Sequence, residues 1–161
     1  MKQTLRISAL ALLLLFTFSL FSCNNASFRD DVAVSTLSDT IEPLIANAAH
    51  LDTADDDYLR FNLDGTEIAA ERVVRLSVSG QSLDEYGIFH APDEASTAAL
   101  SDACNAYLKQ RNEAWMNEYL VEEYPKLRDA EVITMGNYVF YFILSDEEKD
   151  QVITALTEVL Q

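Results

Sequence analysis

The sequence contains few of the residues on which catalytic and cofactor motifs depend. Its 161 residues include only 4 glycines, 3 prolines, 2 cysteines and 2 histidines. It contains no P-loop, dinucleotide fingerprint or nucleophile elbow, and the low glycine and proline content excludes collagen-like and low-complexity chains. Because 49% of the residues are hydrophobic, the composition predicts a packed globular protein, and we expect neither an enzyme nor a bound cofactor.

Positive charge is scarce as well. Lysine and arginine together number 11 against 27 aspartates and glutamates, which gives a formal net charge of −16 at pH 7. Such an acidic chain is repelled by the phosphate backbone of nucleic acids, so we expect no nucleic-acid partner. Carboxylates are so numerous that closeness in sequence cannot single out a general acid and its base.

The sequence also lacks a set of residues at metal-ligand spacing. His50 and His90 lie far apart, and a zinc site needs three or four His, Cys or carboxylate ligands. Cys104 lies in an alanine-rich helical stretch with no basic neighbour to lower its pKa, which indicates a buried packing residue. The acidic run 52–57 is interpreted as a solvated connection, with loose binding of divalent cations as the alternative.

The N-terminal segment has the layout of a secretory signal peptide. Lys2 and Arg6 precede an apolar run over 7–22 that contains no acidic residue. This run is shorter than the roughly 20 residues that a membrane-spanning helix needs, so a retained N-terminal anchor is the weaker alternative. Residues 1–22 are therefore predicted to be a lipoprotein signal peptide.

The residues that follow resemble a bacterial lipobox. Leu20-Phe21-Ser22-Cys23 ends the apolar run with a cysteine, and in lipoproteins that cysteine is acylated and becomes the new N-terminus. We therefore expect Cys23 to carry lipid, 23–32 to be a lipidated tether and 33–161 to form a single domain. Cleavage removes two basic residues and no acidic one, leaving a net charge of −18. Lipidation of Cys23 leaves Cys104 without a disulfide partner.

The spacing of apolar residues predicts the order of helices and strands. Two glutamates lie three residues after a capping residue, in the pairs Asp64/Glu67 and Ser145/Glu148, and each pair predicts the start of a helix. The expected elements are a helix over 33–49 that Pro43 kinks or splits, a short helix to residue 70, strands over 74–79 and 85–90, a long helix over 92–121, strands over 132–135 and 138–144, and a final helix.

Two features of the second strand pair set the expected fold class. Gly136-Asn137 between β-rich runs predicts a two-residue hairpin turn. The run 138–144 is apolar on both alternating faces, which indicates a central strand. The sequence therefore predicts an α+β domain with an N-terminal helix and an antiparallel sheet of two β-hairpins, with helices packed mainly on one face.

Three aromatic residues gather near the end of the predicted long helix. Trp115, Tyr119 and Tyr124 lie beside several glutamates. Aromatic side chains in such positions most often pack in a core, and the alternative is a candidate docking patch for another protein.

One set of residues in the second half of the chain forms a recognisable pattern: Tyr119-Leu120, Tyr124, the run 130–139 and Ser145-Asp146. Through these residues the stretch 57–160 resembles the domain of unknown function 4358, a family of bacterial lipoproteins. It implies a lipid-anchored extracytoplasmic protein and implies no activity, so no catalytic residue is carried over.

Together these observations predict a lipoprotein on the outer face of the cell membrane. We expect a non-enzymatic interaction or accessory module that binds another envelope protein or peptide through a sheet edge or the aromatic residues. The alternative is a lipoprotein that binds a small ligand or a divalent cation. The sequence does not indicate the oligomeric state.

Overall fold

The computed structural model describes residues 28–116 and 118–161. The predicted signal peptide and the predicted lipidation site Cys23 lie outside the described residues. Residues 28–32, the described part of the expected tether, pack against the domain: the Val32 N–H donates to the hydroxyl of Tyr138 at 2.9 Å.

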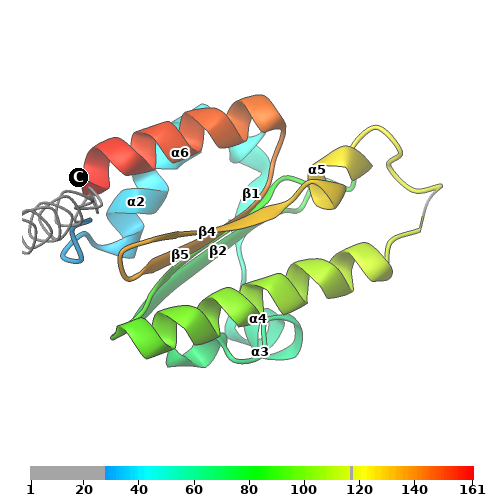
Figure 1. Cartoon of the computed structure of the whole chain (residues 1–161). Helices are drawn as coiled ribbons and strands as arrows, with labels where there is room; N and C mark the ends of the chain where they lie inside the picture. The colour runs from blue at the N-terminus through cyan, green and yellow to red at the C-terminus, as the bar shows by residue number, and fades with distance from the viewer. Residues whose placement is uncertain (1–27, 117) are drawn as a thin grey trace, which may run out of the picture.

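The centre of the structure is a five-stranded antiparallel sheet (Figure 1). Its order is β1 (Leu51–Thr53), β2 (Glu71–Ser77), β3 (Glu85–His90), β5 (Tyr138–Ile143) and β4 (Glu131–Met135). Both predicted hairpins are confirmed, and β5 lies inside the sheet between β3 and β4. Strand β1 was not predicted, because it occupies part of the acidic run that we interpreted as a connection.

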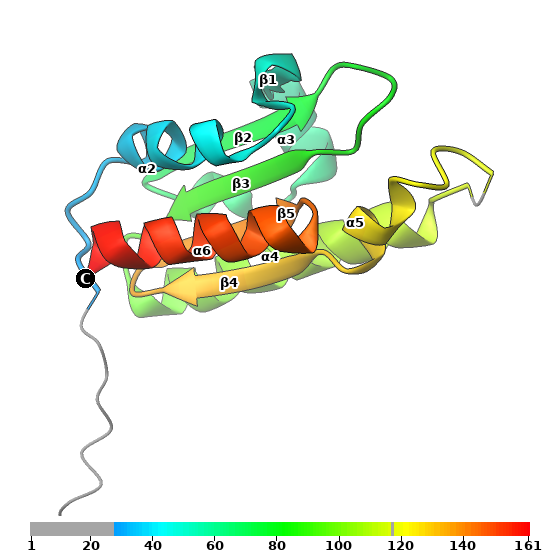
Figure 2. The ribbon, with the colours of Figure 1, turned by 90° about the horizontal axis from the view of Figure 1, so that it is seen from above.

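Helices cover both faces of the sheet, which corrects the expectation that they lie mainly on one. Figure 2 shows α2 (Val34–Ile41) and α6 (Asp146–Leu160) on one face, with α3 (Asp56–Asn62) and α4 (Glu94–Glu113) on the other. The core accordingly divides into two apolar clusters, one on each side. The physical reason is that β3 and β5 carry apolar side chains on both faces of the sheet. Helices must therefore pack on each face to bury these side chains from water. A short helix, α5 (Tyr124–Arg128), leads into β4.

The local signals differ in how well they predicted element boundaries. Gly136 has φ +59°, as the two-residue turn requires, and Ser145 with Glu148 forms the predicted capping box of α6. The expected helix over 33–49 is split, since α2 ends just before a 3₁₀ turn that contains Pro43. The long helix ends at Glu113, well before residue 121.

The predicted capping box at Asp64 is wrong. Gly65, with φ +88°, adopts a left-handed conformation there and leads only into a 3₁₀ turn over Thr66–Ile68. The carboxylate that caps a helix in this region is that of Asp55, which accepts a hydrogen bond from the Tyr58 N–H at 2.7 Å at the start of α3. The acidic run therefore lies in β1 and α3, although its aspartates are exposed as expected.

The described chain begins and ends at the same end of the sheet. The Arg29 N–H donates to the Leu160 carbonyl at 2.7 Å, and Phe28 lies against Gly136 in the β4–β5 turn. We call this the entry end, defined by Phe28, Gly136 and Leu160. The opposite end carries the C-terminus of α4, the β2–β3 loop and α5 (Figure 1).

Candidate docking site at the aromatic end

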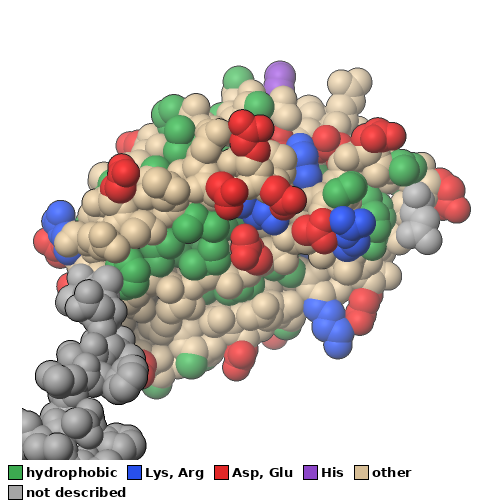
Figure 3. Space-filling model, turned by 45° about the horizontal axis from the view of Figure 1, so that its top comes forward, with side chains coloured by type: hydrophobic (Ala, Val, Ile, Leu, Met, Phe, Trp, Pro, Cys, Tyr) green, Lys and Arg blue, Asp and Glu red, His purple; other side chains and the backbone are tan. Residues whose placement is uncertain are grey.

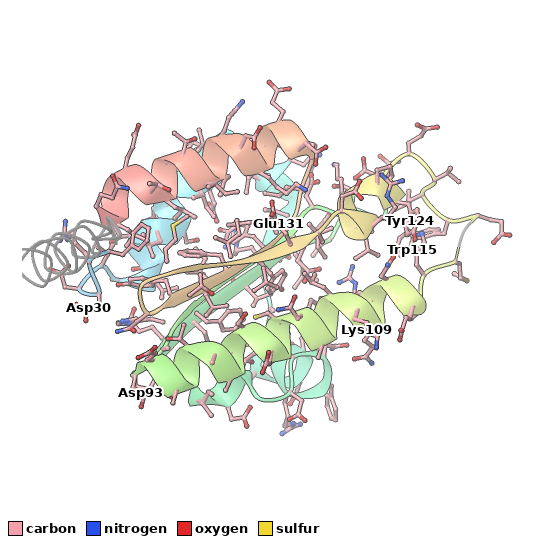
Figure 4. All side chains as sticks on the ribbon, in the orientation of Figure 1. Asp30, Asp93, Lys109, Trp115, Tyr124 and Glu131 are labelled. Carbon is pink, nitrogen blue, oxygen red and sulfur yellow. The ribbon has the colours of Figure 1, made fainter. Side chains whose placement is uncertain are left out.

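The three predicted aromatic residues lie together at the end opposite the entry end. The rings of Trp115 and Tyr124 are stacked with centroids 6.2 Å apart, and those of Trp115 and Tyr119 are tilted at 5.5 Å. Figure 4 shows Trp115 and Tyr124 side by side between the C-terminal end of α4 and α5, far from Asp30 at the entry end. We call this surface the aromatic end and define it by Trp115, Met116, Tyr119, Val121 and Tyr124.

Backbone geometry fixes the segment that carries these rings. Leu120 has φ +46°, the only non-glycine residue with positive φ in the described part of the chain. Its carbonyl accepts hydrogen bonds from the N–H groups of Glu123 at 2.9 Å and Tyr124 at 3.1 Å, which starts α5. Left-handed backbone at a leucine costs on the order of 1–3 kcal/mol, and such strain is frequent at functional sites.

Exposed apolar side chains concentrate here. Met116, Tyr119 and Val121 expose 66%, 45% and 60% of their surfaces. The β2–β3 loop adjoins this segment, because the Tyr119 hydroxyl donates to the Gly80 carbonyl at 3.3 Å. Large apolar groups clustered in this way mark interaction surfaces more often than scattered ones do.

The polar groups around the cluster are acidic. Glu113, Glu118 and Glu122 are exposed along the same segment. The indole Nε1 of Trp115 is buried and has no hydrogen-bond partner among the described residues. The aromatic end therefore offers apolar area with a negative rim.

A buried ion pair holds the aromatic end to the sheet. The Lys126 Nζ donates to Asp84 at 2.6 Å and to Glu123 at 2.9 Å, and Asp84 is fully buried. Burial alone lowers the pKa of Lys126, but the hydrogen bonds that it donates to both carboxylates, together with their negative charges, outweigh burial and raise the pKa. The Leu83 N–H also donates to Glu123 at 3.1 Å. These contacts join α5 to the β2–β3 loop.

A second buried network lies under the last turn of α4. Glu85, 1% exposed, accepts hydrogen bonds from the hydroxyls of Tyr107 at 2.5 Å and Tyr141 at 2.7 Å, and from Arg111 Nη1 at 2.6 Å. Tyr58 of α3 joins it through a 2.8 Å bond to Tyr107. Burial first, and then the charge of Glu85, raises the pKa values of Tyr107 and Tyr141. We interpret this network as a support for the aromatic end.

Sequence reasoning missed both buried networks. Glu85 was placed correctly in a strand, on the same face as Gly87 and Phe89, so its pattern indicated a charge directed toward the core. Its partner Arg111 is 26 residues away in sequence, and periodicity does not pair residues over that distance. One signal could have revealed the network: Glu85 is an acidic residue on an apolar strand face, and a buried charge needs a partner.

Two of the surface clefts adjoin β2 and contain arginine side chains. One of about 400 Å³ lies between α3 and β2, where Asp56 and Arg60 have side chains 96% and 68% exposed. Another, of about 450 Å³, lies between α2 and β2 and is lined by Arg72 and Arg75. The Arg75 guanidinium already bonds Thr53, the Leu51 carbonyl and Glu42. The charges of the first cleft are exposed to solvent, and in the second the Arg75 Nη donors are already bonded while its buried Nε has no partner among the described residues. Neither cleft shows the convergent polar set of a ligand site.

Cys104 and His90, which we considered for thiol or metal chemistry, take part in packing contacts. Cys104 is buried in α4, as predicted, and burial raises its pKa to about 12. The ring of His90 stacks on Tyr138 at 4.5 Å. Within residues 28–116 and 118–161 no group of His, Cys, Asp and Glu side chains is arranged to hold a metal ion.

The fold and surface define an α+β domain whose sheet is covered by helices on both faces and which has an exposed aromatic end. Residues 50–144 match the family described as Domain of unknown function (DUF4358), and the chain belongs to that family. The match is shorter than the predicted resemblance at its C-terminal side, because it ends before α6. No curated protein and no solved structure matches the chain. Among the described helices none is long and apolar enough to cross a membrane.

Proposed function

We propose that this protein is a lipid-anchored extracytoplasmic module whose aromatic end docks another protein of the cell envelope. The observation that carries the proposal is the separation of two features. The chain leaves the domain toward the predicted lipid site Cys23 at the entry end, whereas the exposed apolar side chains gather at the opposite end.

The length of α4 sets the distance between the two ends. Its start adjoins the β4–β5 turn, since the Ala91 N–H donates to the Asn137 carbonyl at 2.8 Å. Its 20 residues rise about 1.5 Å each, which is about 30 Å. A domain tethered at the entry end can therefore present the aromatic end away from the lipid.

Charge supports a protein as the partner. Glu113, Glu118 and Glu122 are exposed on the same segment as the apolar side chains, and anionic lipid headgroups would be repelled by them. A protein surface that carries apolar side chains flanked by lysine or arginine is complementary. We therefore expect a partner of that chemistry.

The anchor is tested by metabolic labelling with a fatty acid. The wild-type chain should incorporate the label, and Cys23→Ala should lose it and accumulate as a precursor or be released. If Cys23→Ala is processed, membrane-bound and labelled as strongly as the wild type, the lipidation proposal fails.

Docking is tested by photo-crosslinking of the full chain in its own membranes. A crosslinking amino acid at Met116 or Val121 should capture one discrete protein, and the same amino acid at the equally exposed Phe61 of α3 should not. Tyr119→Glu should abolish the capture without changing the circular dichroism spectrum. Equal capture from all three positions, or capture that Tyr119→Glu leaves unchanged, would contradict docking at the aromatic end.

A further inference from the structure

Strand β4 forms one edge of the sheet, and its outer side is open. Because Gly136-Asn137 is a two-residue turn, Met135 and Tyr138 form a hydrogen-bonded pair, and bonded pairs then alternate along β4 and β5. Residues 131, 133 and 135 therefore bond to β5, whereas Val132 and Thr134 direct their N–H and C=O groups outward. No backbone group within residues 28–116 or 118–161 pairs with them.

This edge lacks the devices that usually block strand addition. Exposed edges are commonly protected by lysine, proline, bulges or a very short strand. The opposite edge, β1, has three residues and includes Asp52. The central residues of β4 are Val132, Ile133 and Thr134, all β-branched and uncharged. Both backbone and sequence favour pairing with a further strand.

Apolar side chains flank the open edge on both faces of the sheet. Ile133 is half-buried against the cluster on the α6 side, and Val132 against the cluster on the α4 side. Figure 3 shows hydrophobic side chains in a band across this side of the molecule, with acidic side chains beside it. A strand laid along β4 would cover apolar surface with alternate side chains on both sides.

Charge selects the occupant of this edge. Residues 28–161 contain all 27 acidic residues and nine of the 11 basic ones, so the body carries a net charge of −18. Glu131 is exposed at the start of β4 (Figure 4). A second copy would bring the same negative charge, whereas an extended basic segment is attracted.

We propose that the open edge of β4 accepts an extended, lysine- or arginine-rich segment of a partner protein as a sixth strand. The site is the set of outward backbone groups of Val132 and Thr134 with the flanking side chains of Ile133 and Glu131. It is a different surface from the aromatic end, so the inference does not rest on docking there.

The backbone pairing is tested with a short fluorescent peptide of alternating Lys and Val, added to the full chain in mild detergent. Fluorescence anisotropy should report saturable binding. Methylation of every peptide amide removes both hydrogen-bonding edges and should weaken binding by at least about tenfold. Methylation of alternate amides leaves one edge intact and is the matched control, which should retain binding. Equal affinity of the two methylated peptides would overturn strand addition.

The site on the protein is tested with two variants at one position. Thr134→Pro removes an outward N–H that β5 does not use, and proline is tolerated on edge strands. It should weaken peptide binding by at least about tenfold, whereas Thr134→Val, which keeps the N–H, should bind like the wild type. If Thr134→Pro does not fold, the comparison of the two methylated peptides still tests strand addition.

Two further outcomes would overturn the choice of occupant. A Glu/Val peptide that binds as tightly as the Lys/Val peptide would exclude charge selection. Absence of peptide binding together with a dimer that Thr134→Pro dissociates in sedimentation would assign the edge to a second copy of the chain.

Discussion

The two faces of the sheet are closed by different chemistry. The face under α2 and α6 is filled by alternate side chains of β3 and β5 that are almost wholly apolar: Tyr86, Ile88, Tyr138, Phe140 and Phe142. The face under α4 uses the intervening residues of the same strands, but it also buries the Glu85–Arg111 ion pair among tyrosines. Tyrosine hydroxyls are hydrogen-bonded on both faces, such as Tyr86 to Ser38 on the α2 side, but the Glu85–Arg111 ion pair places α4 on the other face through charged, directional bonds.

This difference bears on the aromatic end. Apolar packing tolerates small shifts of a helix, whereas Arg111 and Tyr107 must meet Glu85 at fixed positions. A buried ion pair contributes little net stability, and its best-attested use is to fix register. We infer that the network sets where α4 ends and therefore where Trp115 lies.

Alkaline pH should produce the largest effect. Burial raises the pKa values of Tyr86 on one face and of Tyr107 and Tyr141 on the other above the ordinary value of 10.0. The folded state therefore favours protonated tyrosine, and this stability is fully present below pH 10 and lost as the pH rises toward the folded pKa values. The free energy of unfolding should fall by about 1.4 kcal/mol per pH unit for each such tyrosine.

Denaturant titrations across this pH range, followed with tyrosinate absorbance, measure the slope. Tyr141→Phe should make the slope shallower, because one raised group is removed. A free energy of unfolding that stays constant well above pH 10 would contradict the role assigned to these tyrosines.

Phe140→Ala probes the apolar face. Phe140 is a fully buried residue of β5 in the apolar cluster under α2 and α6. Removing its ring should cost about 3–5 kcal/mol through lost burial and a cavity. Urea denaturation measures the change. Val121→Ala, at a side chain 60% exposed, is the control and should stay within about 0.5 kcal/mol.

Arg111→Ala probes the other face. It leaves the carboxylate of Glu85 buried without its cation, and because Arg111 is itself partly exposed we expect the lower end of the range for broken buried pairs, about 3 kcal/mol. Lys109→Ala on the exposed side of α4 is the matched control. Glu85→Gln combined with Arg111→Met should recover much of the loss, and a double variant as unstable as the sum of both would contradict the ion-pair account.

The contrast between the faces also explains what the sequence could predict. The two-residue period of 138–144 indicated a strand apolar on both sides, and Gly136-Asn137 indicated its turn, because both signals are local. Sequence patterns did not predict that helices pack on both faces of the sheet, or that Glu85 pairs with Arg111. Both features depend on contacts between segments that are distant in sequence. The cluster of Trp115, Tyr119 and Tyr124 was predicted as a candidate because its members are close in sequence, although the contact of Tyr119 with Gly80 was not.

Gly136→Val tests the turn that aligns both faces. With φ +59° a β-branched residue is strained, and an added Cβ would come within 3.0 Å of Phe28. We expect a loss of about 1–3 kcal/mol in the free energy of unfolding. Asn is the conservative replacement, since it tolerates left-handed backbone better, and Gly136→Asn should lose less than Gly136→Val. Equal losses would indicate that contact with Phe28, and not the backbone, dominates.

Asp56→Ala should have the smallest effect and sharpens the comparison between buried and exposed charge. Asp56 lies in the first turn of α3 with its side chain 96% exposed, 3.5 Å from Arg72. Ion pairs in such solvent-exposed positions contribute little, so the free energy of unfolding should change by no more than about 0.5 kcal/mol. Urea denaturation of Asp56→Ala and Arg111→Ala under the same conditions compares the two losses. A loss as large as that of Arg111→Ala would mean that the acidic run 52–57 has a structural or binding role, and the divalent-cation alternative would then gain support over docking.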